Sequence, residues 1–446
     1  MTARNGSASL VRRLAFGSKS YYFFDKLFCQ QPLARISRWG DQPAARIPDH
    51  FARVAYDLVE SIRTRRWAPD IGNAELALLH ATDPLPQNRR YLSYWHDPAI
   101  NTTAGTIVGV DLIRHNGKYH VIEINRGPSI YPRRREMYAE TFDPMFWRIF
   151  ESAPSEGYRK IVPIAFRWHA VYIEEFERAS HALGIPIVPH NCPLQFPECP
   201  RRMFALPDPI EPETLYVIHS GLMSPAVRYL DDKWYSWQWL EHAIREEMPG
   251  TLVALPATHD DFVFPLDDHG PRWPNLVVKL ASSARSTHVI AARFDSVDEA
   301  REALGVGESG RVPDKLRTGF VKGLLFHGSE RVLYQAYVPP ELDEREHARM
   351  LRLHLWLSPQ RTLYLAAHAR ISQKPVPKVA PRGIIRQDGA YIFNDAEYAR
   401  LSPEMEEEIR SVAADLGGAM QRALERKFET GPAQANSSAG STTAIR

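Results

Sequence analysis

Long apolar runs and an excess of one charge are both missing from this sequence. No run of about 18 apolar residues occurs, although a membrane-spanning helix needs that length. Residues 1–24 lack the apolar core and the small-residue cleavage site of a signal peptide. Lys and Arg number 55 against 53 Asp and Glu, so no field of one sign attracts nucleic acid or an anionic membrane. We therefore expect a cytoplasmic protein that binds neither nucleic acids nor membranes.

Cysteine is also scarce. The 446 residues contain only Cys29, Cys192 and Cys199, an odd number that builds no disulfide framework and fits a reducing compartment. His190 lies near Cys192, but structural zinc sites usually have four ligands in close pairs, which favours ordinary loop cysteines. The motifs G-x-S-x-G and G-x-x-x-x-G-K-[ST] are absent as well. The sequence therefore offers no nucleophile constellation, and any phosphate site must use other residues.

The composition is that of an ordinary globular protein, 44% hydrophobic and 24% charged, and is long enough for two or three lobes. Residues 1–100 have mainly helical apolar spacing and no legible function. After residue 107, apolar runs of strand length alternate with amphipathic stretches. This pattern predicts a strand-helix-strand unit over 160–189 and further strands at 215–222, 252–256, 275–281, 287–294 and 331–338. It also predicts a helix over 232–247, an antiparallel strand pair over 351–371, a helix over 402–428 and a disordered tail.

Residues 110–125 are the most informative segment, because two extended runs flank Asn116-Gly117, a strong hairpin signal. Glu123 and Asn125 are two positions apart in the second run, so both project from one face, and His120 is expected on the other. A buried carboxylate needs a basic neighbour or a cation. Mg²⁺ suits this oxygen-bearing pair. A solvent-exposed amphipathic hairpin is the alternative.

The hairpin register decides whether Asp111 joins this pair. A two-residue turn would place Asp111 opposite Ile122 and direct its carboxylate away from Glu123. A three-residue loop over 115–117 would place Asp111 opposite Val121 and bring all three oxygen-bearing side chains to one face. We expect the three-residue loop.

Lys279 lies within the apolar strand 275–281, where a lysine must either snorkel to solvent or meet anionic oxygens. The loop over 282–287, which contains Ser282, Ser283 and Arg285, offers hydroxyl and backbone N–H groups that can fold over phosphates. This arrangement favours a phosphate site, and a lysine at a strand edge beside a surface loop is the alternative.

Two later segments also fit a nucleotide site. The strand that includes residues 335–338 ends at Pro339, as in hinges whose backbone binds an adenine edge. Arg352 and Arg370 lie in consecutive apolar strands, an unusual place for a guanidinium. A guanidinium group held in place and always charged suits the binding of a phosphoryl group during its transfer, and structural salt bridges are the alternative.

Taken in chain order, these features resemble the ATP-grasp superfamily. The features are an Asp-Lys pair at a helix start, a strand ending in proline, a strand lysine, a hinge strand, strand arginines and a closing helix, over 160–428. The hairpin at 107–128 is similar to the family's D…E-x-N metal site, which usually follows the closing helix. The chain thus resembles a circularly permuted ATP-grasp protein, similar in order to glutathionylspermidine synthetases and related carboxylate–amine ligases.

The resemblance implies an α+β fold with two lobes around the nucleotide and an α/β preceding domain. The implied parts are a helical region with the metal hairpin (1–150), a substrate domain (155–228), a small lobe (229–340), the rest of the large lobe (341–430) and a tail (431–446). Two positions depart from the family pattern: the loop after Lys279 has no glycine, and residue 335 is glutamine where an acid is common.

The resemblance also implies roles for individual residues. Contacts to ATP are implied for Lys233, Lys279, Ser282, Ser283, Gln335, Tyr337, Val338 and Glu341. Mg²⁺ ligation is implied for Asp111, Glu123 and Asn125, and stabilisation of the transferred phosphoryl group for Arg352, Arg370 and Arg285.

The implied activity is an ATP-dependent amide synthesis. The γ-phosphate of ATP activates a carboxylate as an acyl phosphate, and an amine of a small molecule or peptide then displaces phosphate. Positioning and charge neutralisation are the main requirements of the phosphoryl transfer. A phosphotransferase on the same scaffold and a non-catalytic ATP-binding protein are the alternatives, and the sequence indicates neither the acid, the amine nor the oligomeric state.

Overall fold

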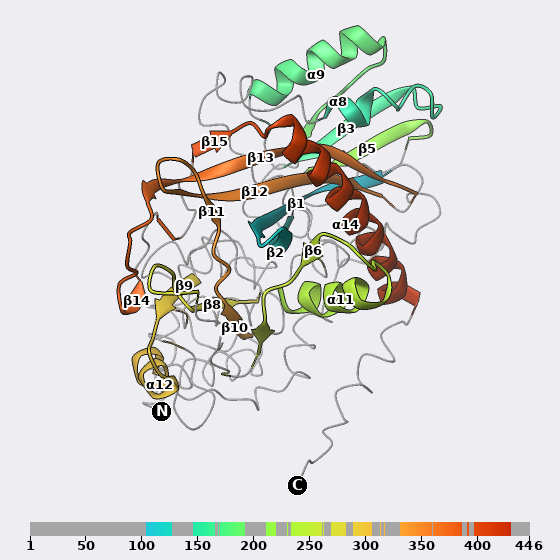
Figure 1. Cartoon of the computed structure of the whole chain (residues 1–446). Coiled ribbons are helices and arrows are strands. Elements are labelled where there is room, and N and C mark those ends of the chain that lie inside the picture. The colour runs from blue at the N-terminus through green and yellow to red at the C-terminus, as the bar shows by residue number, and fades with distance from the viewer. Residues whose placement is uncertain are drawn as a thin grey trace, which may run out of the picture.

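The structure is a computed structural model in which α and β elements are mixed (Figure 1). Within the described residues, the strands form one ten-stranded and one five-stranded sheet. Among the residues that the structure describes, no helix has the length and apolarity needed to span a membrane. The structure describes residues 104–126, 146–165, 168, 170–191, 211–219, 230, 233–260, 262, 269–281, 289–305, 313, 316, 331–358, 360–385, 390–391 and 397–429.

The ten-stranded sheet joins segments that are far apart in the sequence. Its main path runs β15-β13-β12-β1-β5-β3-β4, and β2, β6 and β11 pair beside it. These strands are β1 (Ala104–His115), β2 (Lys118–Arg126), β3 (Lys160–Ala165), β4 (His190–Asn191), β5 (Thr214–Ile218), β6 (Val253–Ala254), β11 (Glu341–Leu342), β12 (His347–Leu357), β13 (Thr362–Pro375) and β15 (Glu397–Ala399).

Strand β1 is central to this sheet. It pairs antiparallel with β12, so that Asp111 lies opposite Arg352, and parallel with β5, so that Thr106 lies opposite Ile218. Metal ligands on the hairpin and phosphate-binding arginines on the strands of 351–371 would have to converge, so the sequence predicts that these segments pack together in one antiparallel sheet. The packing is confirmed by the pairing of β1 with β12, but the sheet is mixed, because β1 also pairs parallel with β5. The sheet is continuous from the hairpin into β3, β4 and β5, which the sequence assigns to a preceding domain.

Two helices cover the apolar face of the sheet, as Figure 1 shows: α14 (Pro403–Glu429) and α11 (Lys233–Glu246). The start of α14 follows from its sequence, since the Ser402 hydroxyl accepts a hydrogen bond from the Met405 N–H and Pro403 occupies the first helical turn. Both helices match the predicted ranges. The core beneath them combines Val110, Leu112, Leu351, Leu353, Leu240, Leu416 and Met420.

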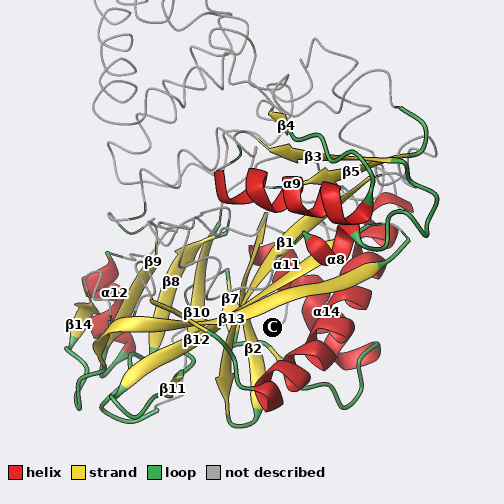
Figure 2. Ribbon diagram, turned by 90° about the horizontal axis from the view of Figure 1, so that it is seen from above, coloured by secondary structure: helices red, strands yellow, loops and turns green. Residues whose placement is uncertain are grey.

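A second core lies where β3 and β5 meet α8 (Trp147–Phe150) and α9 (Ala170–Leu183), which runs along these strands in Figure 2. Phe146, Tyr172 and Phe176 are buried there together with Trp356 of β12. This core belongs to the same side of the ten-stranded sheet as the polar residues of the candidate site.

The five-stranded sheet has the order β14-β9-β8-β10-β7 and carries α12 (Val297–Leu304). Its strands are β7 (Thr258–His259), β8 (Leu276–Leu280), β9 (Val289–Arg293), β10 (Val332–Ala336) and β14 (Gly383–Ile385). Because β14 follows β13 in the chain, one segment passes directly from the larger sheet to the smaller.

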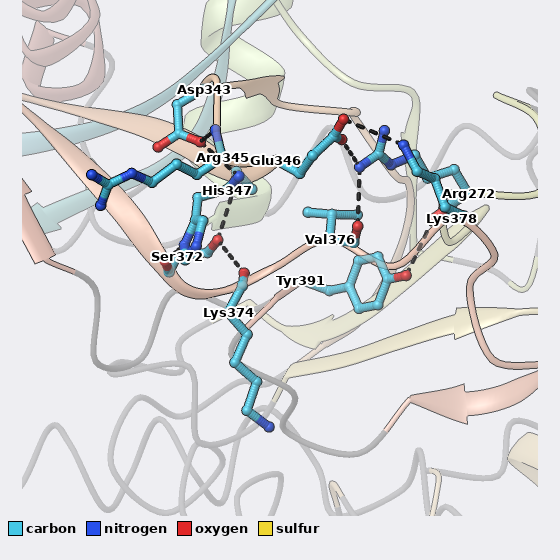
Figure 3. Close-up of polar contacts among 11 residues, drawn as sticks. Arg272, Asp343, Arg345, Glu346, His347, Ser372, Lys374, Val376, Lys378 and Tyr391 are labelled. Atoms are coloured by element: carbon cyan, nitrogen blue, oxygen red, sulfur yellow. Dashed lines mark hydrogen bonds and ion pairs between the residues drawn. The ribbon is translucent and has the colours of Figure 1, made fainter.

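A polar junction holds this crossing in place, as Figure 3 shows. The Arg272 guanidinium donates hydrogen bonds to the Glu346 carboxylate and, at 3.0 Å, to the Val376 carbonyl. The Tyr391 hydroxyl donates a hydrogen bond of 3.2 Å to the Arg272 carbonyl. Glu346 has φ of 65°, a left-handed conformation that non-glycine residues seldom adopt. The junction therefore ties the β11–β12 turn to the loop that precedes β8.

Candidate functional site

The hairpin turn between β1 and β2 differs from the expected one. His115 pairs with Lys118, which leaves a two-residue turn, Asn116 and Gly117. Their φ values of 49° and 71° are the left-handed pair that a type I′ turn requires. The prediction of a three-residue loop over 115–117 was wrong, because Asn-Gly takes the tighter turn whose twist matches the flanking strands.

A bulge in β2 restores the alignment that this turn alone would lose. Leu112 pairs with Val121 but Asp111 pairs with Glu123, so Ile122 is an extra residue on β2. Beyond the bulge, Asn125 lies opposite Gly109. Asp111, Glu123 and Asn125 therefore share one face, as expected, although the cause is the bulge rather than the loop.

The same bulge reverses the alternation of β2. Tyr119 and Val121 face the core under α14 before it, and Ile124 faces that core after it. His120 therefore lies on the same face as Glu123, and the prediction that it lies on the opposite face was wrong.

Four ionisable side chains form one row across four strands. Glu123 of β2 lies opposite Asp111 of β1, Asp111 opposite Arg352 of β12, and Arg352 opposite His368 of β13. Directly opposite residues of antiparallel strands project to the same face. The row thus occupies the sheet face turned away from the core beneath α14.

Asp111 and Arg352 form a buried ion pair at the centre of the row. Arg352 Nε and Nη2 donate to the two carboxylate oxygens, with 2.5 Å between Nε and Oδ1. Arg370 on β13 adds a second cation, with Nη1 3.9 Å from Asp111 Oδ2. Burial opposes ionisation of Asp111, but the charge and hydrogen bonds of Arg352, with help from Arg370, outweigh it and lower the pKa of the carboxyl.

Glu123 has a weaker cationic partner. Lys233 Nζ, at the first residue of α11, lies 3.7 Å from Glu123 Oε1. Burial raises the pKa of the Glu123 carboxyl, Lys233 opposes the rise, and the nearby Asp111 carboxylate adds to it. Glu123 is therefore a carboxyl group whose charge depends on which cation stands beside it.

Lys279 of β8 reaches from the smaller sheet to the hairpin. Its Nζ donates one hydrogen bond of 2.9 Å to the carbonyl of the bulged Ile122 and another of 2.9 Å to Gln335 Oε1. Gln335 Nε2 in turn donates a hydrogen bond of 2.8 Å to the Thr258 hydroxyl. Burial lowers the pKa of Lys279 to about 7, and the positive charge of Lys233 contributes to the fall. The predicted strand lysine thus lies near the β1–β2 hairpin, and Gln335 fixes it in place.

Tyr337, Val338 and Glu341 follow Gln335 on the hinge segment. Tyr337 and Val338 are buried, and the Tyr337 ring stacks on Trp273 with 6.1 Å between ring centroids. The Glu341 carboxylate accepts a 2.9 Å hydrogen bond from Arg114 near the hairpin turn. In the structure these side chains therefore pack the hinge against the hairpin and the loop before β8.

Ser282, Ser283 and Arg285 lie outside the described residues. Their assigned contacts to phosphate stay predictions.

Two buried histidines in this face were not predicted from the sequence. His354 and His368 are fully buried, and their rings stack with centroids 5.2 Å apart. Burial and the charge of Arg352 lower the pKa of His354 to about 3, so its imidazole is neutral. Neither ring nitrogen of His354 has a hydrogen-bond partner among the described residues. The i, i+2 spacing from Arg352 was a signal that could have placed His354 on this face.

We call the six charged side chains of this region the charge cluster. Among the described residues it comprises four bases and two acids: Lys233, Lys279, Arg352, Arg370, Asp111 and Glu123. Four bases against two carboxylates leave the cluster with surplus positive charge when all six are ionised. Basic side chains gathered in a buried site attract anions.

The predicted metal ligands supply two carboxylates and one amide. No group of three or more His, Cys, Asp or Glu side chains in the described ranges is arranged to hold a metal ion. Glu123 and Asn125 nevertheless offer hard oxygen donors of the kind Mg²⁺ prefers. Both oxygens of Asp111 are bonded by Arg352. The donor set fits Mg²⁺, with Asp111 able to join only if Arg352 releases it.

Comparison with known proteins leaves the family open. No protein-family profile and no curated protein matches the sequence. One similar solved structure is a protein of Methylobacillus flagellatus KT that is provisionally named a gamma-glutamylcysteine synthetase. The match covers 80% of this chain and 96% of that chain, with 12% identity and a TM-score of 0.38. Likeness at this level assigns neither fold family nor function, so any function for this protein must be inferred from the charge cluster itself.

Proposed function

We propose that this protein is an ATP-dependent carboxylate–amine ligase of the ATP-grasp type, circularly permuted so that the metal hairpin precedes the other elements. The observation that carries the proposal is the charge cluster, in which four bases and two acids from both sheets and the start of α11 meet. Phosphoryl transfer depends chiefly on such positioning and charge neutralisation.

The roles follow from position. Lys233 and Lys279 bind the phosphates of ATP from the side of the smaller sheet, and the hinge backbone at Tyr337 and Val338 binds adenine. Arg352 and Arg370 lie beside the predicted metal ligands and stabilise the charge of the transferred phosphoryl group. Each of these side chains lies in or next to the charge cluster or the hinge.

Mg²⁺ would be held by Glu123 and Asn125, joined by Asp111, and would neutralise phosphate charge. An oxygen of the acid substrate attacks the γ-phosphorus, and ADP leaves with the electrons of the broken P–O bond. The amine then attacks the acyl carbon, and phosphate leaves with the electrons of the C–O bond while the amine loses a proton to solvent. The products are an amide, ADP and phosphate.

A screen of amino acids and small peptides tests this function. ADP release is measured for each compound alone and in pairs, and hydroxylamine is added to trap acyl phosphate as a hydroxamate. We expect ADP release that requires an acid, with a hydroxamate of that acid as product. ADP release without hydroxamate would instead indicate a phosphotransferase, and no ATP binding or turnover with any compound would reject the proposal.

A further inference from the structure

The two acids of the charge cluster are each paired with one of its bases. Arg352 binds both oxygens of Asp111, and Lys233 lies 3.7 Å from Glu123. All four side chains are at least about five-sixths buried, the most exposed being Glu123 at 16%. Each acid therefore has a built-in counter-ion in a place where water compensates little.

The pairing creates competition for the same atoms. A phosphate group bound here needs the N–H donors of Arg352 and Lys233, which now serve the two carboxylates. A divalent cation bound here needs the oxygens of Asp111 and Glu123, which now serve the two bases. Either ligand alone would leave a buried charge without its partner, an unfavourable outcome.

We propose that the Asp111–Arg352 and Glu123–Lys233 pairs exchange partners when a polyphosphate and a divalent cation bind together. The phosphate oxygens take the two bases, and the cation takes the two carboxylates. This inference rests on the proposed function, because it concerns the same site. It adds that the two acids oppose polyphosphate binding when no divalent cation is present and support it when one is.

The exchange has a reciprocal consequence. Linkage requires that the polyphosphate strengthen cation binding by the same factor as the cation strengthens polyphosphate binding. An acid that is made neutral can no longer oppose the anion or recruit the cation, so the coupling should fall. The unusual expectation is that removing a metal ligand improves anion binding in the absence of metal.

The experiment measures binding of inorganic tripolyphosphate to the full chain by calorimetry, first in EDTA and then with excess Mn²⁺. The variants are Asp111→Asn and Glu123→Gln, which neutralise one acid each. The control is Glu346→Gln, which neutralises a carboxylate paired with Arg272 and Lys378 at the junction of Figure 3, outside the charge cluster. Melting temperature and near-ultraviolet circular dichroism establish that each variant is folded.

In EDTA we expect Asp111→Asn to bind tripolyphosphate about tenfold more tightly than the wild type, and Glu123→Gln about fivefold, within the usual range of coupling between sites. With Mn²⁺ the wild type should gain affinity and both variants should gain much less. The control should follow the wild type in both buffers.

The other outcomes are decisive too. If no form binds tripolyphosphate with or without Mn²⁺, the charge cluster is not an anion site and the proposed function fails with this inference. If the wild type binds but the folded variants bind no more tightly in EDTA, the exchange is refuted and the proposed function stands. If Asp111→Asn does not fold, Glu123→Gln decides alone, because it disturbs only the longer of the two pairs.

Discussion

Replacement of Lys279 by methionine separates a phosphate-binding lysine from a structural one. Lys279 is 3% exposed, and burial, with the charge of Lys233, lowers its pKa from 10.5 to about 7. Methionine keeps most of the apolar stem and removes the amine. The variant therefore tests whether the buried amine stabilises the fold or binds a ligand.

The magnitude follows from linkage. A lysine whose pKa is 10.5 in the unfolded chain and about 7 in the native protein destabilises the native state by about 4 kcal/mol at pH 7. Loss of the bonds to the Ile122 carbonyl and Gln335 costs about 1 kcal/mol each, and more if either acceptor stays unpaired. We expect Lys279→Met to leave the free energy of unfolding unchanged or to raise it by up to about 2 kcal/mol.

The assay measures the free energy of unfolding by denaturant titration at pH 7 and pH 9, and the ATP affinity by calorimetry. Because the native pKa is the lower one, the native state binds fewer protons between the two pKa values, so wild-type stability should rise with pH from 7 toward 10.5. The variant should lose this contribution to the rise. Its ATP affinity should fall about tenfold or more, since a charge-assisted contact is lost. Lower stability with unchanged ATP affinity would refute the reasoning.

Three other perturbations have defined outcomes. Glu123→Ala and Asn125→Ala should each abolish the turnover of ATP, measured by ADP release, while circular dichroism shows that each variant stays folded; wild-type turnover in either would contradict the metal assignment. Burial and nearby histidines lower the pKa of His120 to about 4, so the free energy of unfolding should fall by about 1 kcal/mol as pH falls from 6.5 to 5.5. His120→Gln should remove that loss, which denaturant titrations measure. Gly105→Ala would place a methyl group 2.2 Å from the Trp356 ring and should cost about 1–3 kcal/mol of unfolding free energy; an unchanged midpoint would show that the sheet yields there.

Local patterns predicted most elements of the described fold. The strands β12 and β13 and the helices α11 and α14 lie where apolar periodicity and capping residues place them. The meeting of the hairpin with β12 was also predictable, because metal ligands and phosphate-binding arginines must converge on the same phosphates. That argument uses chemistry to supply a contact between residues 241 positions apart, such as Asp111 and Arg352.

The hairpin register could not be predicted in the same way. Asn116-Gly117 correctly signals a two-residue turn, and that turn alone would direct Asp111 away from Glu123. The bulge at Ile122 corrects the phase, and its carbonyl is satisfied by Lys279 from the other sheet. No local pattern marks the bulge, because the partner that stabilises it lies 157 residues away.

The parallel pairing of β1 with β5 and the burial of His354 and His368 depend on tertiary structure for the same reason. A histidine in an apolar strand reads as a surface or edge residue until its neighbours are known. Here burial and the charge of Arg352 lower the pKa of His354 and keep its imidazole neutral. The sequence therefore supplied the charged residues of the site, and the fold supplied their neutral surroundings.

The energetics of the charge cluster argue for a ligand more strongly than its geometry does. Buried ion pairs add little to stability, because desolvation offsets their attraction, and apolar side chains of similar size often serve as well or better. In this cluster the pKa of Lys279 falls to about 7 as a result of burial and the positive charge of Lys233. A fold selected for stability alone would gain from apolar side chains at these positions. An anion that enters with a divalent cation would balance the cluster's charge, and this is the binding event that the tripolyphosphate experiment measures.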